Sequence, residues 1–230
     1  DSEEIIGAWL RRGTQHVRPL ITTKIANLDH SSPDALRACV REKVADSKAR
    51  LGLEKIPLLM LHRYEDYAAN PENTRAVFEE LRQSGGIERW GISAYSRHDY
   101  RLLAASGADA VQIPVNVFDW KQIRGGGIAA LRGAGIMIFA RSVFLQGLIF
   151  QEPEALDPDM RFAAPALRRF RDLCAEFALE PAVLAASFAL SLPGIACLVL
   201  GCERRRQVED NAALIERTEE LTGAQMARLE

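Results

Sequence analysis

Short apolar segments alternate with longer segments of helical periodicity along most of this chain. Six segments have the length and the β-branched content of strands: residues 20–26, 56–62, 89–95, 110–118, 135–142 and 196–202. This alternation is typical of parallel β-α-β construction, in which a helix covers each strand. We therefore expect an α/β fold with six parallel strands in this chain.

Helix start signals lie between several of these strands. Ser32 and Asn70 each precede a proline and an acidic residue, and Ser96 precedes a third helical segment. Such residues accept hydrogen bonds from the first turn of a helix. Residues 151–165 are irregular and are expected to form a loop, before apolar helices over 166–178 and 181–192.

Two architectures accommodate consecutive β-α units, a doubly wound sheet and a closed (β/α)8 barrel. The doubly wound sheet lacks its usual signature, because no G-x-G-x-x-G turn is present and Gly125–Gly127 does not have that spacing. Polar residues end several strands, as expected where barrel active sites are assembled. We therefore predict a (β/α)8 TIM barrel and a single domain over residues 1–230.

The charge balance excludes a surface built as a whole to attract polyanions. Lys and Arg number 29 and Asp and Glu 31, so the formal net charge is −2. This balance supports neither nucleic acid nor membrane lipid as a partner, and no apolar run reaches the ~20 residues that cross a bilayer. The four cysteines lack metal-ligand spacing. We expect reduced thiols, no metal site and a cytoplasmic protein.

The polar residues at the strand ends are the candidate functional residues. Lys24, His62 and Ser93 each lie at or near the end of a different apolar segment, Gln112 lies within the segment 110–118, and Arg141 and Ser142 end a fifth. A lysine in a buried strand is costly unless paired, and histidine supplies a donor or acid near neutral pH.

Each of these residues also has a structural explanation when taken alone. Lys24 can be paired within the fold, His62 can be a satisfied structural histidine, Gln112 can cap a buried backbone group and Ser93 can close a loop. Individually they leave a catalytic and a structural interpretation open.

Their order along the chain resembles the aldo-keto reductase family. The opening "SEEIIGAWL" is similar to a family helix, and "ITTK", "LLMLHR", "IERWGISAYS", "VQIPVNVFD" and "GIACLVLGCERRRQVEDN" follow in family order. The resemblance covers all 230 residues. It implies a (β/α)8 barrel that binds NADPH or NADP, with NADH possible, without a Rossmann turn.

The resemblance implies a role for each matching residue. A hydride passes to a carbonyl carbon while a tyrosine donates a proton; Lys24 lowers the pKa of that tyrosine and His62 orients the carbonyl. Ser93 and Gln112 match positions that hold the nicotinamide carboxamide, and Arg141 and Ser142 lie beside the ring. The segment from Gly201 to Asn211 matches the one that holds the adenosine end, with Gln207 and Asn211 at its polar positions and Arg204 available for phosphate.

For the "RRRQ" segment at 204–207 a second interpretation is a solvated helix start. Phosphate contact is at least as well supported, because the segment follows a strand that ends near Gly201 and opens a helix whose N–H groups would assist.

The chain departs from the family pattern at its start. The family's tyrosine and its aspartate partner belong to a "D-x-A-x-x-Y-G" segment immediately before the helix with which this chain opens. Tyr64, Tyr67, Tyr95 and Tyr100 all follow other strands. We expect ~40 to 60 residues upstream, with about six of eight strands present here, because a barrel takes about 250 residues.

Further departures concern the cofactor contacts. Ala94 stands where asparagine is common, Arg141 where an aromatic ring commonly stacks on the nicotinamide, and Glu203 where a basic residue helps to recognise the 2′-phosphate. A planar guanidinium can itself stack on the ring. NADP preference over NAD is therefore left open.

We predict an NAD(P)H-dependent oxidoreductase that acts on an aldehyde, ketone or sugar-like substrate, as a monomer or a small homo-oligomer. An alternative is a catalytically weak cofactor-binding subunit with a regulatory or interaction role. A third interpretation is a phosphate-binding isomerase or aldolase barrel in which Lys24 forms a Schiff base. Aromatic residues in loops 118–127 and 143–165 can line the substrate pocket or only pack the loops.

Overall fold

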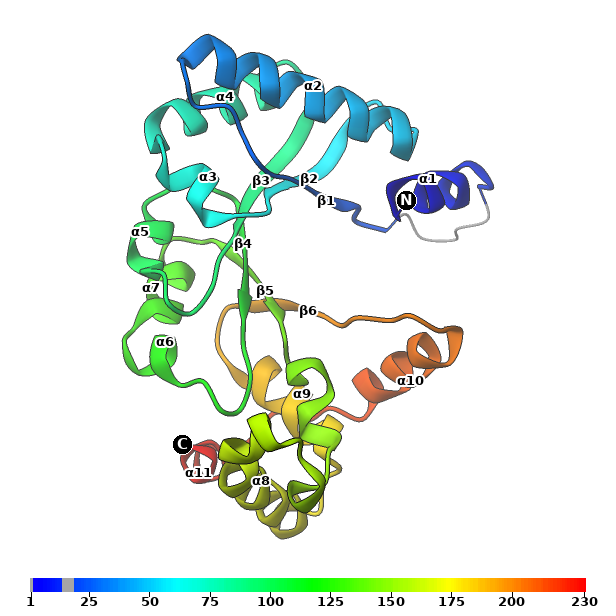
Figure 1. Cartoon of the computed structure of the whole chain (residues 1–230), viewed down its shortest axis with the longest axis vertical. Helices are drawn as coiled ribbons and strands as arrows, with labels where there is room; N and C mark the ends of the chain where they lie inside the picture. The colour runs from blue at the N-terminus through cyan, green and yellow to red at the C-terminus, as the bar shows by residue number, and fades with distance from the viewer. Residues whose placement is uncertain (1, 14–18) are drawn as a thin grey trace. The chain divides into compact units, whose positions relative to one another are not determined.

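The computed structural model describes residues 2–13 and 19–230 and contains one sheet whose strands follow in chain order (Figure 1). The strands are β1 Thr22–Ile25, β2 Ile56–Leu61, β3 Ile87–Ser93, β4 Ala110–Pro114, β5 Met137–Arg141 and β6 Ile195–Val199. All six predicted strands are confirmed. The registers of β1 with β2, β2 with β3, β3 with β4 and β5 with β6 are parallel. A sequential order has no switch point, which agrees with a barrel and not with a doubly wound sheet.

Helices and short 3-10 segments connect the strands. The α-helices are α1 Ser2–Arg11, α2 Pro33–Leu51, α3 Tyr64–Ala68, α4 Pro71–Gln83, α5 Tyr100–Ala104, α6 Lys121–Arg124, α7 Gly127–Gly133, α8 Ala164–Phe177, α9 Pro181–Ser191, α10 Arg205–Glu216 and α11 Gly223–Leu229. The 3-10 segments are η1 Leu145–Phe150, η2 Pro153–Ala155 and η3 Pro158–Ala163.

The contacts group into two compact units. The first unit is Asp1–Ala94, Arg101–Gln112 and Ala134–Ile136, and the second is Tyr95–Tyr100, Ile113–Gly133 and Met137–Glu230. The single domain predicted for residues 1–230 stays a prediction, and each unit is described by itself.

The predicted N-caps of two helices are confirmed. Ser32 Oγ accepts the N–H of Ala35 at 3.0 Å, and Asn70 Oδ1 accepts the N–H of Asn73 at 3.1 Å. Proline follows each cap in the first turn of α2 and α4. The third predicted helix does not begin at Ser96.

The reason is a tight turn between Tyr95 and His98. The His98 N–H donates to the Tyr95 carbonyl at 3.0 Å, and the Tyr95 N–H donates to His98 Nδ1 at 3.1 Å. These bonds hold the chain in a turn, so the helix starts later, at Tyr100.

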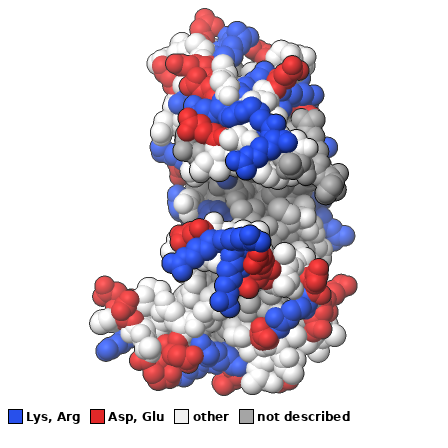
Figure 2. Space-filling view, turned by 90° about the vertical axis from the view of Figure 1, so that its right-hand side faces the viewer, with Lys and Arg blue, Asp and Glu red and all other residues white. Residues whose placement is uncertain are grey.

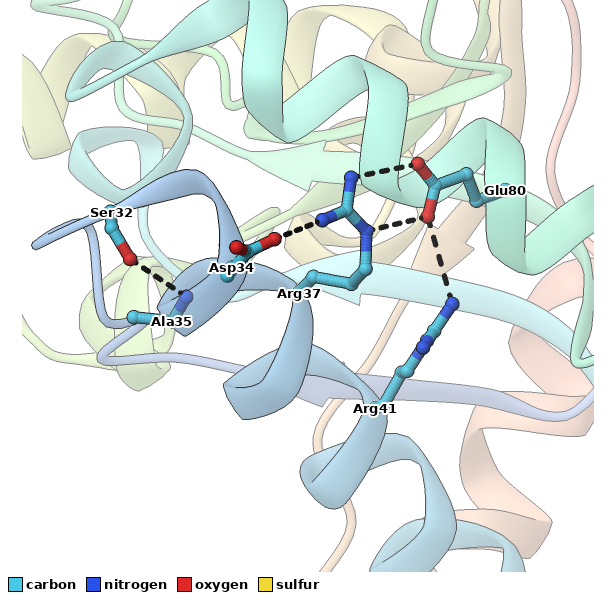
Figure 3. Close-up of polar contacts among 6 residues, drawn as sticks. All are labelled: Ser32, Asp34, Ala35, Arg37, Arg41 and Glu80. Atoms are coloured by element: carbon cyan, nitrogen blue, oxygen red, sulfur yellow. Dashed lines mark hydrogen bonds and ion pairs between the residues drawn. The ribbon is translucent and has the colours of Figure 1, made fainter.

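In the first unit, α2 and α4 lie side by side against β1–β3 (Figure 1). Figure 3 shows the ion pairs that join them: Arg37 Nε and Nη2 donate to the two carboxylate oxygens of Glu80 at 2.9 and 3.0 Å. Arg37 Nη1 also reaches Asp34 at 2.8 Å, and Arg41 lies 3.8 Å from Glu80. The hydrogen bond from Arg37 lowers the pKa of Glu80 below its ordinary value.

Every residue of β2 is buried, and the helices cover one face of the sheet. Trp90 of β3 packs against Phe78 of α4 and Tyr67 of α3, with ring centroids 5.1 and 6.5 Å apart. Because side chains alternate between the faces of a strand, residues next to Trp90 in sequence point away from these helices.

In the second unit, α9 is buried against β6 and α8. The loop aromatics pack on these helices: Phe118 lies 5.7 Å from Phe170 and Trp120 lies 5.2 Å from Phe188, between ring centroids. These contacts favour the packing interpretation of the loop aromatics.

No single helix within residues 2–13 and 19–230 has the length and apolar character to cross a membrane. The bent pair Pro158–Phe177 and Pro181–Ser191, whose two parts meet at 89°, passes the same test of length and composition together.

Candidate active site

Three of the predicted site residues form one row across the first unit. Leu61 pairs with Ile92, so the next residues, His62 and Ser93, lie beside each other, and Ser93 pairs with Gln112. Neighbours in a parallel register point to the same face of the sheet. His62, Ser93 and Gln112 therefore share one face at the carboxyl ends of β2, β3 and β4.

Lys24 belongs to the same face. It pairs with Met60, which precedes His62 by two residues and so points to the same side as His62. The opposite face carries Trp90 and is covered by helices. The structure thus brings Lys24, His62, Ser93 and Gln112 to the same face of the strands of the first unit, opposite the face that packs on the helices.

Burial differs along this row. Ser93 and Gln112 are 7% and 5% exposed, Lys24 is half-buried and His62 is exposed. Ser93 and Gln112 thus place a hydroxyl and a carboxamide, both groups that donate and accept hydrogen bonds, at buried positions of this row. Both interpretations of Gln112, a cofactor contact and a cap of a buried backbone group, stay predictions.

Arg141 and Ser142 lie at the end of β5 in the second unit. The Arg141 guanidinium lies 4.5 Å from the centroid of the Tyr95 ring, and its Nη1 donates to Ser142 Oγ at 3.1 Å. Arg97 lies over the same ring at 4.6 Å. The aromatic ring on which Arg141 stacks in this structure is therefore a residue of the chain itself.

The segment from Gly201 to Asn211 folds back on the start of α10. Gln207 Oε1 accepts the N–H groups of Glu203 and Arg204 at 2.7 and 2.9 Å, and Asn211 Nδ2 lies 3.0 Å from Cys202 Sγ. Both polar side chains that were assigned to the cofactor thus order the loop around Gly201. Their contact with a cofactor stays a prediction.

The arginines of α10 also have partners on their own helix. Arg205 pairs with Glu209 at 2.8 Å and Arg206 with Asp210 at 3.8 Å. Figure 2 shows basic and acidic side chains next to one another on the face that carries α10. Since all four side chains are exposed, these pairs contribute little to stability.

Two tyrosines have pKa values that exclude a readily formed phenolate. Burial raises the pKa of Tyr67 and of Tyr100. Among the residues that the structure describes, the Tyr100 hydroxyl also has no hydrogen-bond partner. Neither tyrosine has the lowered pKa that proton donation at neutral pH requires.

No metal centre is found in the described part of the chain. Residues 2–13 and 19–230 contain no group of three or more His, Cys, Asp or Glu side chains arranged to hold an ion. The four cysteines are free thiols.

Sequence reasoning missed one residue next to the row, Asp66 of α3. Its carboxylate is 7% exposed and accepts the backbone N–H groups of Asn27 and Leu28. The segment 63–67 resembles an ordinary charged helix start. The position of Asp66 between Tyr64 and Tyr67 is the only sign in the sequence that it lies against the core.

A cavity of about 230 Å³ lies in the second unit, bounded by the loop after β4, α8 and α11. Phe118, Trp120, Phe170 and Leu173 supply its apolar walls and Arg169 is its basic residue. The Arg169 guanidinium donates to the Arg228 carbonyl at 2.9 Å.

A model of the aldo/keto reductase family matches residues 1–230. An aldo-keto reductase, str7, from Strobilurus tenacellus is 26% identical, over 97% of this chain and 72% of its own length. The uncharacterized oxidoreductase YqkF from Bacillus subtilis (strain 168) is 25% identical, over 91% and 72%.

Solved structures show the same fold. The holo form of the aldo-keto reductase AKR11C1 from Bacillus halodurans matches 99% of this chain and 76% of its own chain, with a TM-score of 0.77 and 21% identity. The thermostable aldo-keto reductase Tm1743, solved with the inhibitor epalrestat, matches 99% and 76%, with a TM-score of 0.73 and 18% identity. The predicted fold class, that of the (β/α)8 barrel with six strands represented here, is confirmed.

Proposed function

The chain belongs to the aldo-keto reductase family, whose members are NAD(P)H-dependent oxidoreductases, and we propose that it reduces an aldehyde, ketone or sugar-like carbonyl to an alcohol, or catalyses the reverse reaction. The observation that carries this proposal is the shared face of Lys24, His62, Ser93 and Gln112. Lys24 and His62 are the proposed catalytic residues, and the cofactor is NADPH or NADP, with NADH as the alternative.

The cofactor, when bound, supplies the hydride. Ser93 and Gln112 fit a carboxamide, because their buried side chains offer a hydroxyl and an amide, which supply both donors and acceptors. These side chains would hold the nicotinamide end. Gly201, Arg204, Gln207 and Asn211 are proposed for the adenosine end, and Arg141 and Ser142 for the vicinity of the nicotinamide ring.

His62 and Lys24 act on the carbonyl oxygen and its proton. The exposed imidazole of His62 can donate a hydrogen bond to an oxygen that gains negative charge as the carbonyl is reduced. The Lys24 ammonium favours an ionised neighbour, so it lowers the pKa of a proton donor placed against it. A hydrogen bond that strengthens as charge develops accelerates the reaction, because it is stronger in the transition state than in the ground state.

A second candidate function is cofactor binding with little or no turnover. It differs from the first in lacking a proton donor beside Lys24 and His62; burial raises the pKa values of Tyr67 and Tyr100, so neither of these two is proposed as that donor. Such a protein would serve as a regulatory or interaction subunit.

The partner is proposed to be a small carbonyl or alcohol molecule, with no nucleic acid and no membrane. A cytoplasmic location and a monomer or small homo-oligomer stay predictions of the sequence.

Cofactor titration and one lysine variant test the proposal. We expect saturable quenching of intrinsic fluorescence by NADPH, and consumption of NADPH at 340 nm with members of a panel of aldehydes, ketones and sugars. The Lys24→Met variant should lose at least about a hundredfold in kcat, the scale of proton-transfer catalysis, with the Kd for NADPH unchanged within about twofold.

Lys55→Met is the matched control, because Lys55 is an exposed lysine immediately before β2. It should leave kcat and Kd unchanged. Turnover that survives in Lys24→Met contradicts the catalytic assignment, and saturable binding without turnover in the unaltered protein supports the second candidate function instead.

A further inference from the structure

Asp66 is a buried carboxylate that binds a turn distant in sequence. Its Oδ2 accepts the N–H of Asn27 at 3.1 Å and its Oδ1 accepts the N–H of Leu28 at 3.0 Å. At 7% exposure, a carboxylate without such donors would be unfavourable. Both oxygens therefore make charge-assisted hydrogen bonds, which are stronger than those between neutral groups.

The turn that Asp66 binds is the one through which the chain leaves β1. Asn27 has a φ of 57°, in the left-handed region, which asparagine adopts more readily than most other non-glycine residues and which turns the chain here. Arg63 Nη1 supplies another contact, because it donates to Asn27 Oδ1 at 2.8 Å. Lys24 lies immediately upstream of this turn.

The groups that hold the turn come from the segment that follows His62. The His62 N–H itself donates to the Ile25 carbonyl at 2.8 Å, and Arg63 and Asp66 come next along the chain. Hydrogen bonds thus connect the residues that follow β1, which carries Lys24, to the residues that follow β2, of which His62 is the first. Both oxygens of Asp66 accept N–H groups of Asn27 and Leu28, so these hydrogen bonds hold the turn after β1 and not the first turn of α3.

We propose that Asp66 is a positioning residue that holds the Asn27–Leu28 turn and thereby fixes Lys24 relative to His62. This inference rests on the proposed function, because the proposed function assigns Lys24 and His62 to the same reaction. Its geometry is a property of the first unit alone. Arg63 assists through Asn27.

The test compares Asp66→Asn with Asp29→Asn. Asparagine keeps the volume of Asp66 but loses the charge and one acceptor, while Asp29 accepts the Ser31 N–H at 2.9 Å in the same loop and is exposed. We expect Asp66→Asn to exchange the amide hydrogens of Asn27 and Leu28 roughly tenfold faster, because a hydrogen bond to a charged group is lost. Asp29→Asn should leave both rates unchanged.

A second readout reports the lysine itself. The rate at which an N-hydroxysuccinimide ester acetylates Lys24 can be measured by mass spectrometry of peptides. This rate should change by a few-fold or more in Asp66→Asn, because local opening alters the access of reagent to the lysine side chain. It should not change in Asp29→Asn. Diethyl pyrocarbonate modification reports His62 in the same way. In turnover assays Asp66→Asn should lower kcat and leave the Kd for NADPH unchanged.

The outcomes separate the two proposals. Faster amide exchange with unchanged Lys24 labelling overturns the positioning role and leaves a structural one, and unchanged exchange overturns the inference at its first step. If the unaltered protein neither binds NADPH nor turns over a carbonyl while the labelling of Lys24 still depends on Asp66, the proposed function fails and the positioning of Lys24 stands. Should Asp66→Asn not fold, Arg63→Gln must raise the same exchange and labelling rates to a smaller extent, and its failure to do so contradicts the inference.

Discussion

Gly91 shows how closely the strands of the first unit approach on the face that carries the candidate site. A Cβ atom there would lie 2.6 Å from the Ala110 carbonyl oxygen and 2.9 Å from Met60 Cε. The Met60 side chain can move, but the Ala110 oxygen belongs to the strand with which Gly91 pairs. The backbone distance between β3 and β4 therefore leaves no room for a side chain larger than hydrogen at position 91.

We predict that Gly91→Ala destabilises the protein by about 1 to 3 kcal/mol, the usual cost of overpacking. The measurement is the midpoint of urea unfolding followed by circular dichroism. Gly133→Ala is the control, because a Cβ atom at Gly133 meets nothing within 4 Å. Equal midpoints for the two variants would show that the β3–β4 pair can shift without cost.

The residues that were predictable from sequence are those whose chemistry conflicts with their position. The sequence indicates Lys24, His62 and Gln112 as candidates, because each is a polar side chain in or beside an apolar strand. Asp66 did not, because a carboxylate in a charged segment is ordinary. Its significance arises from a turn 39 residues earlier in the chain, and contacts at such separations have no local signal.

The same limit explains Gln207 and Asn211. Their spacing matched a family pattern, but sequence cannot distinguish a side chain that contacts a ligand from one that caps its own helix. In the structure Gln207 caps α10 through two backbone N–H groups. The two roles are compatible if the cap orders the loop that meets the cofactor.

At the scale of elements, strand cores were predictable and strand ends were not. The apolar segment 110–118 suggested a long strand, yet β4 ends at Pro114. Proline has no N–H for a ladder, and Asn116 Oδ1 then accepts the Phe118 N–H at 3.0 Å and turns the chain. The apolar residues Val115 and Val117 therefore lie in the turn after β4, where they are buried without being part of the strand.

Glu3 of helix α1 forms hydrogen bonds with both β1 and α2. It accepts hydrogen bonds from Thr23 and, at 2.6 Å, from Arg50 Nε. Burial alone would raise the pKa of Glu3, but the hydrogen bonds from Thr23, Arg50 and Ser47 outweigh burial and lower it. The charged form of Glu3 is thus favoured in the folded protein.

This predicts how stability depends on pH. A carboxyl group whose folded pKa is depressed contributes stability above its unfolded pKa, ordinarily 4.5 for this group, and loses that contribution as pH falls through the folded pKa. We expect the unfolding free energy of the unaltered protein to fall more steeply below about pH 4.5 than that of Glu3→Gln.

Urea unfolding at a series of pH values between 3 and 7 supplies the measurement, and Glu4→Gln, an exposed neighbour on α1, is the control. That control should retain the full slope of the unaltered protein. Parallel curves for Glu3→Gln and the unaltered protein would mean that the Glu3 contacts do not persist in solution.

At the scale of the whole molecule, the proposed site residues divide between the two compact units. Lys24, His62, Ser93 and Gln112 belong to the first, and Arg141, Ser142 and the Gly201–Asn211 segment belong to the second. The first set is assigned to the nicotinamide end of the dinucleotide, as are Arg141 and Ser142 of the second unit, whereas the Gly201–Asn211 segment is assigned to the adenosine end. A fragment of the cofactor should therefore engage only part of the chain.

We predict that 2′,5′-ADP, which carries the adenosine and the 2′-phosphate of NADPH, protects peptides spanning Gly201–Asn211 from hydrogen exchange and leaves peptides containing Ser93 or Gln112 unchanged. NADPH should protect both sets, and at a hundredfold excess over Kd it should add about 2.7 kcal/mol to the unfolding free energy. Arg204→Ala should weaken 2′,5′-ADP by about tenfold, as expected when a charged hydrogen bond is lost.

Arg217→Ala is the matched control, because Arg217 is an exposed arginine at the opposite end of α10, where it pairs with Glu180 at 2.6 Å. It should leave the affinity for 2′,5′-ADP unchanged, so that a difference between the two variants reports a position on the helix and not overall charge. Protection by 2′,5′-ADP around Ser93 and Gln112 would contradict the assignment of those residues to the nicotinamide end. Equal binding of NADPH and NADH, with no response to Arg204→Ala, would instead mean that Glu203 has removed recognition of the 2′-phosphate, because a carboxylate beside that group repels it.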